Sequence, residues 1–165
     1  MRLGYSLGSL LSINQILDCA SHLSKYHPDT IWIPETWGME NFSMLSMVSQ
    51  KATSSKIGSS IINIYSRSPS LIAMGATTVD TISNGRLILG LGTSSIPIIE
   101  DFHGSKFEKS VSRMREYVEI IRLAVSGKQV DYNGDFFKLK NFSLLIRPIR
   151  NSIPIYLAAV NQKMV

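Results

Sequence analysis

Apolar residues along this chain form two alternating patterns. Short runs rich in Ile, Leu and Val are bounded by Gly, Pro, Ser or Asn, and between them apolar residues recur every three or four positions. The first pattern is typical of strands and the second of amphipathic helices. Strands are therefore predicted at residues 3–7, 30–34, 56–63, 86–91 and 153–159, with four helices between them. Strict alternation of this kind predicts an α/β fold with a parallel sheet.

Capping signals mark where the first two helices begin. Ser12 is followed three residues later by Gln15, which predicts a capping box at the start of the first helix. Ser43 is predicted to cap the second helix, with Phe42 packing on Met47 as a hydrophobic staple. Each of these helices therefore has a defined start in the sequence.

The later helices are bounded by proline and glycine. Ser68 and Pro69 supply an N-cap and a proline at the first position of the third helix. Asn84–Gly85 is a stop signal for that helix, and Gly127 closes a fourth one. The pair Asn133–Gly134, between β-forming residues, then predicts a hairpin with a type I′ turn.

Two architectures accommodate five strands and four helices in alternation. A (β/α)8 barrel repeats the strand–helix unit eight times and needs about 250 residues, whereas a flavodoxin-like doubly wound sheet has five strands. The turn at residues 7–11 has no dinucleotide-binding fingerprint, and the sequence contains no Walker-type loop. These absences disfavour a nucleotide-binding open sheet, although the pattern alone leaves both architectures open.

Composition narrows the class of protein. With 44% hydrophobic and 18% charged residues in 165 positions, the chain has an ordinary globular composition and room for one core. Its net charge of +5 comes from Lys and Arg residues scattered without a run of three, so nucleic-acid binding is not predicted. No apolar run approaches the ~20 residues that a membrane helix needs, and the first residues do not predict a signal peptide.

The single cysteine, Cys19, falls on the apolar face of the first predicted helix. It cannot form an internal disulfide and is interpreted as a small core residue, which fits a cytoplasmic location. No group of His, Cys, Asp and Glu residues has metal-ligand spacing, so no metal site is predicted.

Four segments, taken in order, resemble the luciferase-like oxidoreductases that depend on coenzyme F420, the group that includes the methylenetetrahydromethanopterin reductases and the F420-dependent dehydrogenases. These segments are residues 31–38, 57–69, 83–93 and 155–159, and the linking stretch 113–117 with its following hairpin is similar too. The resemblance implies a (β/α)8 TIM barrel of which residues 1–165 form the N-terminal half of one domain. That half would have about five strands and four helices with a β-hairpin insertion. The resemblance also accounts for the length of the chain, since family members are about twice as long.

The resemblance implies a cofactor at the C-terminal ends of the strands, where barrels of this kind carry their chemistry. Glu35, after the second strand, would hold the deazaflavin ring, and a cis peptide bond between Ser60 and Ile61 would back it. Thr93 corresponds to a threonine that contacts the cofactor. A stretch of backbone would lie against the cofactor after the fifth strand, formed by Ala158, Ala159, Val160 and Asn161.

The sequence departs from specific members of the group. Thr36 and Ser95 stand where the glucose-6-phosphate dehydrogenases have a histidine and a glutamate, and Ser6 stands where the reductases have a glutamate. No catalytic residue is therefore assigned by the resemblance. Glu100 and His103 are weak candidates for an acid/base pair, but their i, i+3 spacing favours a helix cap or a salt bridge.

Arg86 is a candidate phosphate-binding residue, but it is placed at the N-terminal end of its strand. That end of a barrel serves stability rather than catalysis, so we expect Arg86 to pair with Asp80 or Glu116.

Three functions are consistent with these features. The first is hydride transfer between coenzyme F420 and a small organic substrate, and the second is an FMN-dependent luciferase-like monooxygenase. The third is a non-catalytic fragment, truncated or split, that needs a homodimer partner or a complementing C-terminal half-barrel. Half a barrel would leave Ile61 and Leu89 only partly covered and would expose strand edges that invite association.

Overall fold

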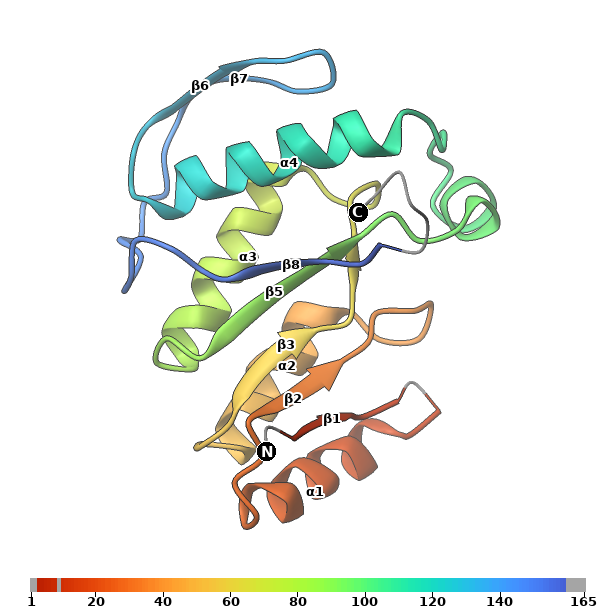
Figure 1. Cartoon of the computed structure of the whole chain (residues 1–165), viewed down its shortest axis with the longest axis vertical. Helices are drawn as coiled ribbons and strands as arrows, with labels where there is room; N and C mark the ends of the chain where they lie inside the picture. The colour runs from red at the N-terminus through yellow and green to blue at the C-terminus, as the bar shows by residue number, and fades with distance from the viewer. Residues whose placement is uncertain (1–2, 9, 160–165) are drawn as a thin grey trace.

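The computed structural model describes residues 3–8 and 10–159, which form a parallel sheet with helices on one face (Figure 1). The elements, in chain order, are β1 (Gly4–Ser6), α1 (Ile13–Ser24), β2 (Thr30–Ile33), α2 (Asn41–Lys51), β3 (Lys56–Ser59), β4 (Ile62–Asn63), α3 (Pro69–Ile82), β5 (Leu87–Gly92), the π-helical turn η1 (Ile98–Phe102), α4 (Ser110–Val125), β6 (Val130–Asn133), β7 (Lys138–Phe142) and β8 (Ile155–Leu157). The predicted alternation of strands and helices is confirmed.

The order of the strands decides between the two architectures left open by the sequence. β1 pairs with β2, β2 with β3, β3 and β4 with β5, and β5 with β8, all in parallel. Each strand of the alternation therefore lies beside its successor. A flavodoxin-like sheet would instead place its first strand in the interior. The sheet is thus part of a (β/α)8 barrel, with the antiparallel β6–β7 hairpin inserted after α4.

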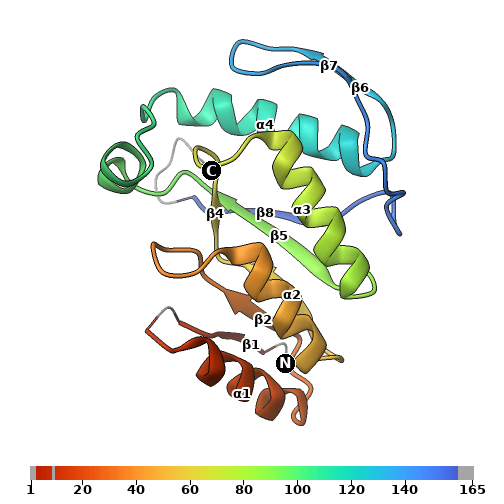
Figure 2. The same ribbon diagram turned by 180° about the vertical axis from the view of Figure 1, so that it is seen from behind.

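The core lies between the sheet and its helices. Seen from behind, α1, α2 and α3 cover the sheet (Figure 2). Successive residues of a strand point to opposite faces, so Ile31, Ile57 and Leu87, which are paired across the sheet, are all fully buried on the helix side. Leu89 belongs to the same buried set, so the expectation that it would be partly covered is wrong. Ile61 is partly covered, as expected.

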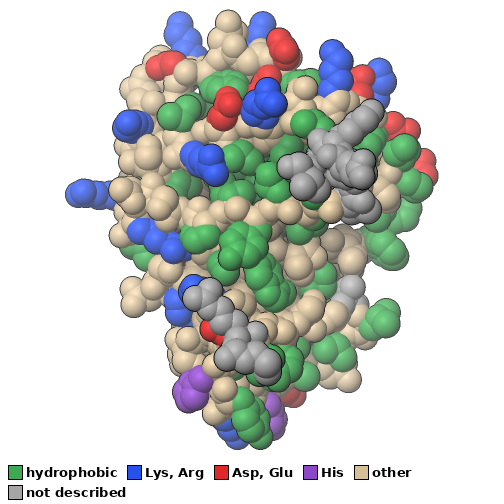
Figure 3. Space-filling view, viewed as in Figure 1, with side chains coloured by type: hydrophobic (Ala, Val, Ile, Leu, Met, Phe, Trp, Pro, Cys, Tyr) green, Lys and Arg blue, Asp and Glu red, His purple; other side chains and the backbone are tan. Residues whose placement is uncertain are grey.

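The opposite face of the sheet, which would line the interior of a closed barrel, is exposed toward the viewer in Figure 3. Trp32 lies there over Gly58, where a Cβ would come within 2.4 Å of the indole ring. Tyr156 packs beside Trp32, with 5.8 Å between their ring centroids, and remains 56% exposed. The exposed apolar surface on this face of the sheet therefore comes from Trp32 and Tyr156, whereas Leu89 is buried.

Most helix boundaries follow the local signals in the sequence. The Ser12–Gln15 capping box is present, and Ser68 caps α3 through the backbone N–H of Leu71. Gly85 and Gly127 each adopt a positive φ of 77° just after a helix, a conformation that glycine reaches at little cost. Cys19 packs partly buried against the core.

The start of α2 differs from the prediction. Glu40, rather than Ser43, is the N-cap, because its carboxylate accepts hydrogen bonds from the backbone N–H groups of Phe42 (3.1 Å) and Ser43 (2.8 Å). Ser43 thus lies inside the helix. Phe42 packs closely over Gly75 of α3, where a Cβ would lie 2.7 Å from the ring, whereas Met47 is exposed.

The hairpin is confirmed but its turn is not type I′. Four residues connect β6 and β7, and neither Asn133 nor Gly134 has the positive φ that a type I′ turn requires. The carboxylate of Glu116 in α4 shapes the connection by accepting hydrogen bonds from the backbone N–H groups of residues 135–137. A side chain at position 134 would meet this carboxylate at 2.3 Å.

The expected pairing of Arg86 with Asp80 or Glu116 is wrong. Its guanidinium instead donates hydrogen bonds to backbone carbonyl groups at the ends of α2 and α3 and in the α2–β3 loop, those of Ser49, Ala52, Ser55 and Ser83. Burial lowers the pKa of Arg86 from its ordinary value. Arg86 therefore closes the ends of two helices, while Asp80 pairs with Arg150 and Glu116 holds the hairpin.

Candidate functional site

The C-terminal edge of the sheet carries the residues that the family resemblance implies. Glu35 follows β2, Ser60 and Ile61 connect β3 to β4, and Thr93 follows β5. Ala158 and Ala159 follow β8 at the same edge, whereas Val160 and Asn161 lie outside the described residues. The Ser60–Ile61 peptide bond is cis, as the resemblance predicts, and it separates β3 from β4 within the single strand expected at 56–63.

Ile61 and Ala158 form a small apolar floor around Gly92. A Cβ added at Gly92 would lie 2.5 Å from Cδ1 of Ile61 and 3.4 Å from Cβ of Ala158. Ser59 fixes the neighbouring backbone, because its hydroxyl donates to the carbonyl of Gly90 (2.9 Å) and accepts from the Gly90 N–H (2.7 Å). Gly92 thus leaves room for the Ile61 side chain. Ile61 and Ala158 are both only partly buried, so the floor offers an apolar surface that fits a planar cofactor.

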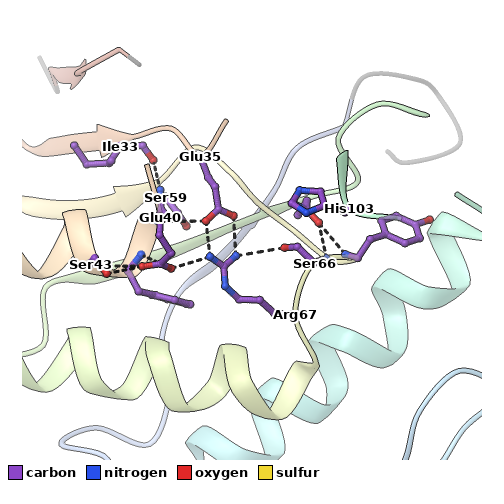
Figure 4. A network of polar contacts seen from close by, with 12 residues as sticks. Ile33, Glu35, Glu40, Ser43, Ser59, Ser66, Arg67 and His103 are labelled. Carbon is purple, nitrogen blue, oxygen red and sulfur yellow. Dashed lines mark hydrogen bonds and ion pairs between the residues drawn. The ribbon is translucent and has the colours of Figure 1, made fainter. Parts of the chain in front are cut away.

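Glu35 and Arg67 form a bidentate ion pair at the same edge of the sheet (Figure 4). Arg67 Nη1 lies 2.8 Å from Glu35 Oε2, and Nη2 lies 2.6 Å from Oε1. The Arg67 side chain is 15% exposed and the Glu35 side chain 8% exposed. Glu35 also accepts a hydrogen bond from the backbone N–H of Asn41. The hydrogen bonds that Arg67 donates to Glu35 raise the pKa of Arg67 despite its partial burial. Glu35 is therefore a fixed, paired carboxylate.

Two further contacts hold Arg67 in place. Its Nη2 also contacts Glu40 at 2.7 Å. Burial would raise the pKa of Glu40, but hydrogen bonds from Ser43 and Phe42 and the charge of Arg67 hold it below its usual value. The fully buried Tyr117 donates its hydroxyl to the carbonyl of Arg67, and burial raises the pKa of that hydroxyl.

Sequence reasoning includes Arg67 and Tyr117 in family-like segments but assigns neither a role. The partner of Arg67 lies 32 residues earlier, and the carbonyl that Tyr117 contacts lies 50 residues earlier. No local pattern connects residues at such separations. The sequence does show an acidic and a basic residue, Glu35 and Arg67, each in the segment that follows a predicted strand. Their opposite charges make them candidates for an ion pair.

A cleft of about 380 Å³ opens beside the ion pair. Trp37 and His103 line it together with Glu35, Ser66 and Arg67. Trp37 packs edge-on against Phe102 of η1, with 5.7 Å between ring centroids. The cleft therefore combines a fixed ion pair, an imidazole and an exposed aromatic wall.

Glu100 and His103 are not brought together as a pair in the part of the chain that the structure describes. Glu100 accepts the backbone N–H of Phe107 at 3.0 Å, so it caps the loop that follows η1. His103 instead turns toward Asn63 at the end of β4, with 3.5 Å between Nε2 and Nδ2. Glu100 thus binds the backbone of a loop rather than the end of a helix, and of the two residues His103 is the one that lines the cleft.

The described ranges 3–8 and 10–159 contain no cluster of three or more potential metal-binding side chains. Within the same ranges, none of the helices has both the length and the apolar character needed to span a bilayer.

Comparison with known proteins supports the resemblance. The model of the luciferase-like monooxygenase family matches residues 1–165. The chain is 39% identical over 137 residues to 5,10-methylenetetrahydromethanopterin reductase of Archaeoglobus fulgidus, covering 82% of this chain and 40% of that protein. It is 25% identical over 144 residues to the F420-dependent glucose-6-phosphate dehydrogenase of Amycolatopsis mediterranei, covering 79% and 43%.

Solved structures agree on the fold. The F420-dependent tetrahydromethanopterin reductase of Methanopyrus kandleri superposes with a TM-score of 0.88 at 23% identity, covering 99% of this chain and 51% of that one. An FMN-bound Baeyer–Villiger monooxygenase encoded on a Pseudomonas putida plasmid gives 0.78 at 15% identity, covering 95% and 51%. The chain thus spans about two-fifths to one-half of the proteins it matches.

Proposed function

This chain belongs to the luciferase-like monooxygenase family, and on that premise we propose that it provides the cofactor-facing half of an oxidoreductase. The reaction is hydride transfer between coenzyme F420 and a small organic substrate. The observation that carries the proposal is the apolar floor of Ile61 and Ala158 around Gly92, at the edge where Glu35 and Thr93 also lie. Relatives in sequence that are named as F420-dependent support the choice of cofactor.

In this proposal the floor residues position the cofactor ring. The ring is bound by residues that follow three of the strands: Ser60, Ile61, Thr93, Ala158, Ala159, Val160 and Asn161. When bound, the deazaflavin supplies or accepts the hydride, and the protein contributes orientation and electrostatics. The described residues fit this task because the floor is apolar, and the charged groups Glu35 and Arg67 are not among the residues that form it.

Glu35 acts through Arg67 in this proposal rather than as an isolated carboxylate. Both of its oxygens are occupied by Arg67, and one also accepts the Asn41 N–H. Glu35 therefore holds the loop after β2 against the segment after β4. That contact fixes the wall of the cleft next to the ring.

FMN is the alternative cofactor. The apolar floor suits either ring, and the FMN-bound monooxygenase shares the fold. Coenzyme F420 is favoured because the proteins named for it, at 25% and 23% identity, are more similar in sequence to this chain than the FMN-bound monooxygenase, at 15%.

Full activity requires the rest of the barrel. The open aromatic face of Trp32 and Tyr156 needs cover, which further barrel strands would supply, whether in the same polypeptide, on a complementing half-barrel or on a second copy. Without that cover the chain would be a non-catalytic fragment with weak cofactor affinity. A cytoplasmic location is also proposed, supported by the single, partly buried Cys19.

Cofactor titration of the purified chain tests the proposal. Fluorescence titration with F420, and in parallel with FMN, should give weak but saturable binding with F420 preferred. Ala158→Phe should weaken that binding about tenfold or more, a loss of about 1.4 kcal/mol, because the new ring fills the floor. Thr53→Phe, exposed at the opposite edge of the sheet, is the matched control. Equal effects of the two substitutions, or preference for FMN, would overturn the assignment.

A further inference from the structure

Asn63, the last residue of β4, has its side-chain amide oriented by the backbone that follows it. Its Oδ1 accepts hydrogen bonds from the N–H groups of Tyr65 (3.0 Å) and Ser66 (2.8 Å). Because both partners are donors, the atom facing them must be the oxygen. The Nδ2 group, which can only donate, therefore points the other way. Asn63 is 6% exposed, so this orientation is enforced by its surroundings.

The Nδ2 group faces the imidazole of His103. Nε2 of His103 lies 3.5 Å from it, which is long for a hydrogen bond, as contacts in ligand-free sites often are. In a neutral imidazole one nitrogen donates and the other accepts, and the partner of one sets the role of the other. Since Asn63 offers a donor, this contact favours the tautomer in which Nε2 accepts and Nδ1 carries the proton.

We propose that Asn63 is a positioning residue that fixes His103 as the neutral Nδ1–H tautomer, so that His103 donates a hydrogen bond to a carbonyl oxygen of the substrate. His103 is exposed and lines the same cleft as Glu35 and Arg67 (Figure 4). A preorganised neutral donor stabilises negative charge that develops on a carbonyl oxygen when hydride adds to its carbon. This inference rests on the proposed function and adds the class of substrate, a carbonyl compound.

Charge in the cleft agrees with an uncharged carbonyl substrate. Glu35 and Glu40 together carry two negative charges against the single positive charge of Arg67, whose guanidinium they share. No positive charge is thus left over in this group for a phosphate ester. Trp37, 73% exposed against Phe102, offers an apolar surface to the body of the substrate.

Nitrogen NMR of the histidine rings tests the tautomer in the 165-residue chain without any cofactor. His22 is an internal reference, because its Nδ1 lies 2.8 Å from the carbonyl oxygen of Asp18 and must donate to it. We expect the His103 ring, assigned with His103→Gln, to match the Nδ1–H signature of His22 at a pH where both rings are neutral. A His103 ring in the Nε2–H form would overturn the proposal before any variant of Asn63 is made.

Asn63→Asp is the matched variant. A carboxylate keeps an oxygen for the N–H groups of Tyr65 and Ser66 but replaces the donor that faces His103 with an acceptor. His103 should switch to the Nε2–H tautomer while the His22 signals stay in place. No switch in a folded variant would contradict the role of Asn63.

Acetone serves as a minimal carbonyl probe. Its addition should shift the His103 ring signals in the natural chain, and the shift should be lost in Asn63→Asp. Absence of a shift in the natural chain would overturn the substrate assignment. Failure of F420 binding with the tautomer and the acetone response intact would instead count against the proposed cofactor alone.

Discussion

Arg150 reaches back 70 residues to Asp80 and binds its carboxylate with two hydrogen bonds, from Nε (2.8 Å) and Nη2 (2.6 Å). Asp80 is 3% exposed in its side chain and also accepts the backbone N–H of Leu87. Through this pair the segment that leads into β8 is tied to the end of α3 and the start of β5.

The Asp80–Arg150 pair is expected to control global stability. Removing one partner of a buried pair leaves an uncompensated charge and costs about 3–5 kcal/mol, so Arg150→Ala should lower the free energy of unfolding by an amount near that range. Urea denaturation measures it. The double variant with Asp80→Ala should be less destabilised than the sum of the two single variants, and simple additivity would mean that the pair is not coupled.

The Glu35–Arg67 pair is expected to affect both stability and the cleft. Arg67→Lys keeps the charge but loses the planar, two-pronged geometry, and we expect it to lower the melting temperature and weaken F420 binding together. Glu35→Gln should do the same. Thermal unfolding and fluorescence titration measure the two effects. Weaker binding with an unchanged melting temperature would indicate direct contact of Glu35 with the cofactor instead.

Glu40 is expected to make stability depend on acid pH. Its pKa is lowered below 4.5 in the folded protein. A carboxyl group of this kind adds stability above its unfolded pKa, and that contribution is lost as the pH falls through the folded pKa. Denaturation midpoints of the natural chain should thus fall more steeply between about pH 5 and pH 3 than those of Glu40→Gln. Parallel curves would exclude a contribution from Glu40.

Gly90 is expected to tolerate no side chain. A Cβ there would lie 1.9 Å from the backbone oxygen of Ser59, and backbone cannot move aside as a flexible side chain can. Gly90→Ala should destabilise the chain by about 1–3 kcal/mol or more, or prevent folding. Gly8→Ala is the control, because a Cβ at Gly8 meets nothing within 4 Å. Circular dichroism and urea denaturation compare the two, and equal stability would refute the packing argument.

The exposed aromatic face is expected to drive self-association. Tyr156 packs with Trp32 on the face that a closed barrel would bury, and exposed apolar patches favour association. The purified chain should elute as a dimer or larger species in size exclusion, and Tyr156→Lys should shift it toward the monomer. Tyr26→Lys, at a residue 80% exposed after α1, should not. A monodisperse monomer in the natural chain would contradict this expectation.

Local signals determined much of the fold. The capping box at Ser12 and Gln15, the stops at Gly85 and Gly127 and the spacing of apolar residues each depend on neighbours within a few positions, so the sequence displays them directly. The cis bond at Ser60 and Ile61 was also predictable, although only through the family resemblance. The start of α2 was not, because a cap by Glu40 competes with one by Ser43 and only geometry decides between them.

The tertiary structure alone decided which charged groups meet. Arg86 was expected to bind a carboxylate and instead binds four carbonyl groups, while Arg67 joins Glu35 and Arg150 joins Asp80 across 32 and 70 residues. Periodicity in a sequence reports which face of an element is buried, but it carries no information on which faces meet. Ion pairs and hydrogen bonds act over a few ångströms, so their partners are chosen only when the sheet has brought distant strand ends to one edge.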